Sequence, residues 1–249
     1  MFNKSNIALK KLSLLFAVFI VLFSCKEDTE VSFTDKTIEK TDNAKINITY
    51  PKAEGNEKVA NRINNTLENF LANEINMSEK TDKNLMLEDA IKAFDAEYKS
   101  FKEDFSDSTQ EWEASIESEV NYDSGKILCV TVNSYLDTGG AHGNSHVTFL
   151  NFDKKYGELL KMEDIIKDEE GFKKLAAPYF EKATKPISND EEVQDMFFGE
   201  AFQLPENIGF NAEGVILIYN IYEIASYAQG VTEFTIPYDE AKPFLKIEL

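Results

Sequence analysis

Both histidines of the chain lie in one short segment, His142-Gly143-Asn144-Ser145-His146. Two histidines four residues apart can bind zinc when they share one face of a helix. Glycines before and between them favour a loop or the entry of a strand instead, and no HExxH glutamate is present. A zinc site would need a distant third ligand, for which Asp137 is the nearest candidate. We therefore predict no metal and no cofactor, with His142 hydrogen-bonded to fix a turn.

The sequence also lacks a recognisable nucleophile. It has no G-x-S-x-G elbow, and a triad built from Ser134, Ser145 or Ser226 would be arbitrary. Adjacent carboxylates are expected by chance among 45 acids, and they indicate a solvated face. No catalytic residue is predicted. The alternative to a chain without catalysis is an enzyme, an envelope hydrolase or deacetylase that would use His142 and His146.

Tyrosines cluster in the last third of the chain, at 219, 222, 227 and 238. A tyrosine combines apolar area with a polar tip, so such a set could stack on sugar rings or anchor a protein partner. The alternative is an ordinary core and hairpin edge. Five residues are candidates for ligand binding: Tyr135, His142, His146, Tyr222 and Tyr227.

The first 24 residues resemble a secretory signal, with Lys4, Lys10 and Lys11 before an apolar stretch from Leu12 to Phe23. The segment ends in Leu-Phe-Ser-Cys25, which resembles the lipobox of bacterial lipoproteins. We expect Cys25 to carry the lipid and to hold the protein at a membrane, on the outer membrane or cell surface. An ordinary signal peptide with an incidental cysteine is the alternative. Residues 25–43 are polar and are predicted to form a flexible tether.

The remainder is strongly acidic, because removal of three leader lysines leaves 23 bases against 45 acids, a net charge of −22. This charge repels phosphate backbones, and Arg62 is the only arginine, so nucleic-acid binding is not expected. Cationic partners are favoured. Cys129 lies in the apolar run 127–130 and is expected to be a small buried side chain outside any disulfide.

Apolar periodicity predicts an α+β fold in two intimately associated units. The first unit, residues 44–160, has an antiparallel twisted sheet with helices packed on one face. Its expected strands are 46–50, 112–122, 127–135 and 147–152, and its expected helices are 59–75 and 87–105. The second unit, residues 161–249, has helices at 162–166, 172–180 and 190–198, a hairpin over 209–219, a strand at 233–236 and a last helix to 245.

Two stretches carry a family resemblance. Tyr135-Leu-Asp-Thr-Gly-Gly-Ala-His-Gly143, continuing to Leu150-Asn-Phe-Asp and Gly157-Glu-Leu-Leu, resembles the PdaC/RsiV-like domain of unknown function. Tyr219-Asn-Ile-Tyr-Glu-Ile-Ala-Ser-Tyr-Ala-Gln-Gly230, then Phe234-Thr-Ile-Pro-Tyr, resembles its companion domain, with Ser226 where that domain usually has proline.

In similar proteins the pair forms the outer part of a lysozyme-sensing anti-sigma factor, and the first domain also precedes a peptidoglycan deacetylase domain. The resemblance implies a binding or sensing module of the cell envelope, for lysozyme, another cationic protein or wall glycan. It carries over no activity, because neither the catalytic domain nor the cytoplasmic part has a counterpart here.

Overall fold

The computed structural model describes residues 31–78, 80–185, 196–197 and 199–247. The expected leader and Cys25 therefore lie outside the described residues, as does most of the expected helix 190–198. None of the helices in the described part of the chain combines the length and the hydropathy needed to cross a bilayer.

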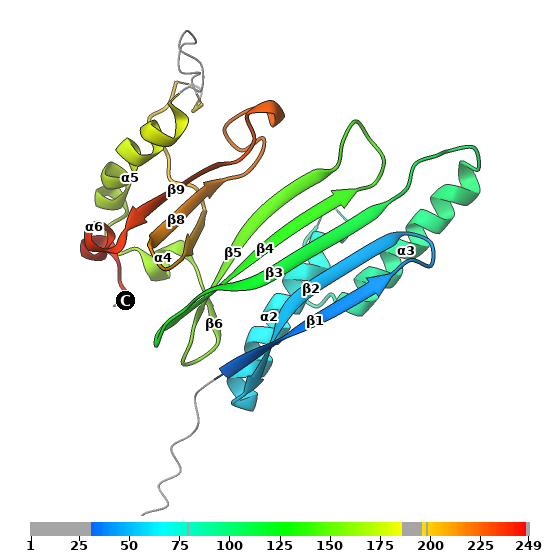
Figure 1. The fold of residues 1–249 in the computed structure, drawn as a ribbon, viewed down its shortest axis with the longest axis horizontal. Helices are drawn as coiled ribbons and strands as arrows, with labels where there is room; N and C mark the ends of the chain where they lie inside the picture. Colours follow the sequence, from blue (N-terminus) through cyan, green and yellow to red (C-terminus); the bar gives the residue numbers. More distant parts are fainter. Residues whose placement is uncertain (1–30, 79, 186–195, 198, 248–249) are drawn as a thin grey trace, which may run out of the picture.

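A six-stranded sheet forms the first part of the molecule, with its strands in chain order from edge to edge. The strands are β1 (Val31–Lys40), β2 (Lys45–Gly55), β3 (Glu113–Asp123), β4 (Ile127–Asp137), β5 (Asn144–Asp153) and β6 (Glu158–Leu160). Helices α2 (Glu57–Glu74) and α3 (Leu87–Asp104) cover one face of the sheet (Figure 1). Their apolar stripes pack on the sheet, as the periodicity predicted.

One strand pair departs from the predicted antiparallel arrangement. Strands β2 and β3 pair in parallel, with Ile46 opposite Ala114 and Ile48 opposite Ile116. The two helices lie between these strands in the sequence and return the chain to the same end of the sheet, so the next strand runs in the same direction. The other pairs of this sheet are antiparallel.

The prediction of a tether over residues 25–43 is wrong from Val31 onward, because residues 31–40 form the edge strand β1. Its backbone pairs with β2 along ten residues, from Val31 opposite Gly55 to Lys40 opposite Ile46. An edge strand gains its order from this ladder and needs few apolar side chains of its own. Phe33 and Ile38 pack against the core beneath.

The second part is a three-stranded antiparallel sheet with short helices around it. Its strands are β7 (Asn207–Phe210), β8 (Gly214–Tyr219) and β9 (Thr232–Pro237). Its helices are α4 (Met162–Ile165), α5 (Glu169–Thr184) and α6 (Tyr238–Ala241), with 3₁₀ turns η1 (Tyr227–Gln229) and η2 (Lys242–Phe244). The α+β class is confirmed, with both sheets open.

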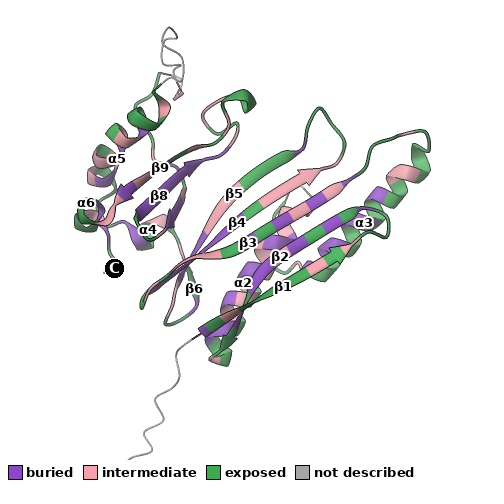
Figure 2. Cartoon of the chain, viewed as in Figure 1, coloured by how far each residue is buried: buried purple, intermediate pink, exposed green. Residues whose placement is uncertain are grey.

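Strand β4 belongs to two hydrophobic cores at once. Leu128 and Val130 point into the core under α2 and α3, whereas Ile127 and Cys129 point into the core of the second part. A bulge near Tyr122 in β3 shifts the register there, and Tyr122 packs against the second core. Figure 2 shows the central strands buried where the two sheets meet, and β1 largely exposed.

Candidate binding surface

The loop between β4 and β5 presents His142 at one end of the sheet. Gly139 adopts a positive φ of 86°, and its N–H donates to the Asp137 carboxylate at 2.9 Å. Gly143 packs so closely on the Tyr135 ring that a Cβ there would lie 2.4 Å from it. Larger residues would not fit either position without a shift, so the glycines fix the loop that carries His142.

A second loop, between β8 and β9, presents Tyr222 and Tyr227. Tyr222 has a φ of 69°, a conformation that costs a non-glycine residue about 1 kcal/mol. Glu223 accepts a hydrogen bond from the Asn220 backbone, and the Ser226 N–H donates to the Gln229 side chain. Side-chain caps at both ends therefore hold a strained loop that leaves Tyr222 60% exposed.

The structure brings His142, Tyr222 and Tyr227 together, and we call these three side chains the aromatic tip. The rings of His142 and Tyr227 stack with centroids 3.9 Å apart and an interplanar angle of 25°. The rings of Tyr222 and Tyr227 lie 6.0 Å apart. Tyr227 is 41% exposed, so the tip offers aromatic faces to solvent. It joins residues that are about eighty positions apart in the sequence.

Hydrogen bonds at both ring nitrogens orient His142. Its Nδ1 lies 2.9 Å from the Gly143 carbonyl, which can only accept, so Nδ1 donates. Its Nε2 lies 3.3 Å from the Tyr222 hydroxyl. These two contacts hold the ring in the orientation in which it stacks on Tyr227.

The other two predicted binding residues lie beside the tip and have other partners. His146 Nε2 is 3.2 Å from the Asn220 amide nitrogen. The Tyr135 hydroxyl is 3.4 Å from the Asp137 carboxylate, and desolvation together with this negative charge raises the pKa of Tyr135. Among the described residues, the side-chain hydrogen-bond partners of the two histidines are therefore different.

Two asparagines missed by the sequence analysis join the two parts of the molecule. Asn220 receives the Val147 N–H at 2.8 Å and donates to its carbonyl at 3.0 Å. Asn207 receives the Phe149 N–H at 2.9 Å and donates to the Val147 carbonyl at 2.6 Å. These amides occupy the open edge of β5 as a further strand would. The only sequence signal is for Asn220, a polar residue that directly follows the apolar run of β8.

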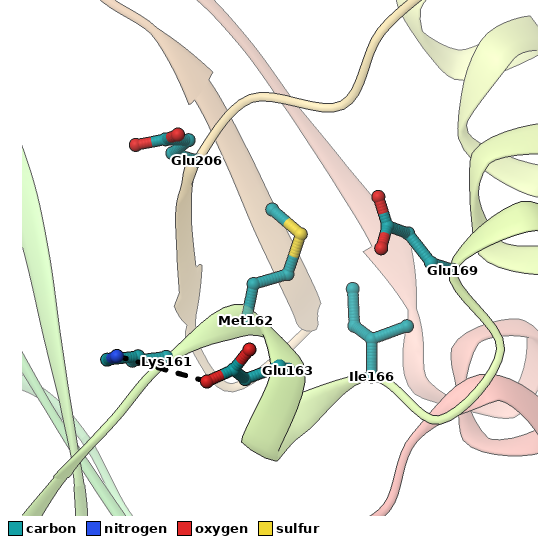
Figure 3. Close-up of a pocket in the computed structure, with 6 residues that line it drawn as sticks. All are labelled: Lys161, Met162, Glu163, Ile166, Glu169 and Glu206. Carbon is teal, nitrogen blue, oxygen red and sulfur yellow. Dashed lines mark ion pairs between the residues drawn. The ribbon is translucent and has the colours of Figure 1, made fainter.

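No group of three or more His, Cys, Asp or Glu side chains in the described part of the chain is placed to hold a metal ion. A cavity of about 490 Å³ lies at α4, and Figure 3 shows the side chains that line it. They are Lys161, Met162, Glu163, Ile166, Glu169 and Glu206. The cavity is acidic, with three glutamates and one lysine, and this lysine, Lys161, pairs with Glu163.

Each of the two parts of the chain matches a known protein family. Residues 37–145 match the family described as Deacetylase PdaC, and residues 163–239 match the protein family of unknown function DUF3298. The two family models match consecutive parts of the chain, PdaC first and DUF3298 second. The recognition made from the two sequence stretches is confirmed. The aromatic tip joins the PdaC region, through His142, to the DUF3298 region, through Tyr222 and Tyr227.

Two solved structures share this fold. A DUF3298 family member from Bacteroides fragilis has a TM-score of 0.58 and 21% identity, covering 88% of this chain and 96% of its own. A DUF3298 family protein from Pseudomonas aeruginosa PAO1 has a TM-score of 0.56 and 21% identity, covering 87% and 93%. No curated protein matches the chain significantly in sequence. The similarity establishes the fold of the tandem.

Proposed function

We propose that the PdaC–DUF3298 tandem is a lipid-anchored binding module of the bacterial cell envelope, and that the aromatic tip is its binding surface. The observation that carries this proposal is the stack of His142 on Tyr227, with Tyr222 beside it, on an exposed surface. Exposed large apolar side chains that gather at one place favour a binding site over a solvated surface.

The construction of the tip supports a binding role. Tyr222 retains a positive φ in an exposed loop, where strain is kept when the surrounding structure over-determines it, as at ligand-binding sites. The stack on Tyr227 and the hydrogen bond between Tyr222 and His142 hold the rings in place, so binding would cost little side-chain ordering. Flat, pre-oriented rings suit the apolar faces of sugars as well as hot-spot contacts with a protein.

Charge and the expected anchor narrow the class of ligand. A net charge of −22 outside the leader favours a cationic protein such as lysozyme, and stacked rings favour the glycan of peptidoglycan. A lipid on Cys25 would hold the module where both ligands occur. The two ligands differ in salt dependence, because charge attraction is screened and ring stacking is not.

The test is binding of the purified lipidated protein, in detergent, to lysozyme and to insoluble peptidoglycan at low and high salt. Replacement of Tyr227 by alanine removes the ring on which His142 stacks and should weaken binding roughly tenfold, as loss of an aromatic hot spot does. Tyr222→Ala should act in the same direction.

The matched control is Met86→Ala, which truncates another exposed apolar side chain, 63% exposed, at the start of α3. It should bind as the wild type does. Salt-sensitive binding identifies the cationic protein as ligand, and salt-insensitive binding identifies the glycan. If wild type and Tyr227→Ala bind both ligands with equal affinity, the aromatic tip is not the binding surface.

A further inference from the structure

The edge strand β1 shortens the link between the expected anchor and the folded body. Only five residues separate Cys25 from Val31, where β1 begins. A fully extended chain spans at most about 3.5 Å per residue, so Val31 can lie no more than about 20 Å from an acylated Cys25. A tether through residue 43 would have allowed about three times this distance.

The β5–β6 turn lies at the end of the molecule where β1 begins (Figure 1). Val31 pairs with Gly55, and α2 starts two residues later. Gly157 of the turn then packs on α2, because a Cβ at Gly157 would lie 2.8 Å from the Val59 carbonyl. Arg62 of α2 donates to the Tyr156 carbonyl at 2.9 Å. The start of β1 and the β5–β6 turn therefore both lie at the N-terminal end of α2.

This turn has the composition of a membrane-interface contact. Tyr156 in the turn, residues 154–157, and Leu159 in the adjoining strand β6 are among the exposed large apolar residues, at 51% and 44%. Lys155 lies over the Tyr156 ring, with Nζ 4.7 Å from its centroid, and Lys154 pairs with Asp123. Tyrosine prefers the boundary between headgroups and acyl chains, and lysine can bury its stem there with its charge in water.

We propose that the β5–β6 turn rests on the bilayer that the Cys25 lipid enters, with Tyr156 and Leu159 at the headgroup level. This inference relies on the lipid anchor of the proposed function. Strand β5 has ten residues and separates the turn at its end from the His142 loop at its start by about 30 Å. The aromatic tip therefore points away from the membrane, toward ligands in the space beyond it.

The test places one fluorophore at either end of the lipidated full chain in phosphatidylcholine vesicles that contain a nitroxide-labelled phosphatidylcholine as quencher. Lys155→Cys labels the turn, and Gly140→Cys labels the exposed loop that carries His142. A Cβ at Gly140 has space, since its nearest neighbour, the His142 carbonyl oxygen, would be 3.9 Å away. Cys25 is blocked by acylation, and Cys129 is buried with its pKa raised to about 12 by desolvation, so only the new thiol reacts.

Quenching should be several-fold stronger at position 155 than at position 140. In the Lys155→Cys protein, a further Leu159→Glu change should reduce quenching, because a charge replaces the apolar contact. Equal quenching at both positions, or no effect of Leu159→Glu, would overturn the inference.

Sedimentation of the same samples separates this inference from the proposed function. Wild-type protein that sediments with vesicles, while Cys25→Ser stays in the supernatant, supports the anchor whatever the quenching shows. If the protein sediments and position 155 is not quenched, only the orientation fails. If wild type and Cys25→Ser behave alike, the anchor and the orientation both fail.

Discussion

At the scale of single residues, Asn220 has the most demanding position at the junction of the two parts. It is 4% exposed, and its side chain bonds both backbone groups of Val147 and the ring of His146. A buried donor or acceptor that loses its partner costs about 1–3 kcal/mol. Removal of the Asn220 side chain should therefore destabilise the protein, because buried groups would lose a hydrogen-bond partner.

We expect Asn220→Ala to lower the free energy of unfolding by about 2 kcal/mol, because it leaves the Val147 N–H without its partner, while the Val147 carbonyl keeps only the hydrogen bond from Asn207. The measurement is the midpoint of urea unfolding. Asn133→Ala, at an exposed position of β4, is the control and should change the free energy by less than about 0.5 kcal/mol. Equal midpoints for Asn220→Ala and wild type would contradict the role given to this amide.

At the scale of elements, the sequence predicted what local periodicity determines. Helices α2 and α3 were expected at 59–75 and 87–105 and occur at Glu57–Glu74 and Leu87–Asp104. The hairpins β3–β4 and β7–β8 were also expected, since turn residues separate alternating strands. Cys129 is buried, as its apolar neighbours predicted.

The features that were missed depend on contacts that no local pattern records. Strand β1 is ordered by pairing with β2, and the parallel pairing of β3 with β2 depends on where the helices return the chain. Three of the five candidate binding residues form the tip, although nothing in the sequence gives their mutual distance. Asn207 and Asn220 were not considered, because an amide that satisfies a strand edge looks in sequence like any loop asparagine.

Asp95 of α3 secures the turn between β1 and β2. Its carboxylate accepts from the Asn43 side-chain amide at 2.8 Å, from the backbone N–H groups of Asn43 and Ala44 at 3.1 and 3.0 Å, and from Lys40 at 3.2 Å. Burial alone raises the pKa of Asp95, but these hydrogen bonds outweigh it, so the pKa lies below its usual value of 3.8. The ionised form is therefore the one that the folded protein stabilises.

We expect Asp95→Asn to destabilise the protein by about 2 kcal/mol at pH 7. Because the folded pKa is depressed, the contribution is complete above the unfolded pKa of about 3.9 and is lost as the pH falls through the folded value. The stability difference between variant and wild type should thus be constant from pH 7 to 5 and shrink below about 4. Urea unfolding across this range measures it, with the exposed Asp35→Asn as control. A pH-independent difference would exclude the charge as the cause.

At the scale of the whole molecule, the two parts are joined by more than surface contact. Strand β4 supplies Val130 to the first core and Cys129 to the second. The Asn151 and Asn121 side chains donate across the junction to backbone carbonyls of β7, at 2.6 and 2.7 Å. One part cannot unfold without exposing apolar surface and unsatisfied polar groups of the other. This geometry also fixes the tip, since its residues come from both parts.

The chain contains one probe in each core with which to test this coupling. Trp112, the only tryptophan, is 7% exposed and packs with Phe94 in the first core, and the thiol of Cys129 is buried in the second. In the Cys25→Ser variant, Cys129 is the only thiol. If the parts unfold as one unit, tryptophan fluorescence and Cys129 reactivity should follow a single urea transition with one midpoint.

Val215→Ala, which truncates a side chain of the second core only, should then shift both midpoints equally. A shift of thiol exposure alone would show that the DUF3298 region unfolds independently, and the tip would then be a contact between separately folded domains.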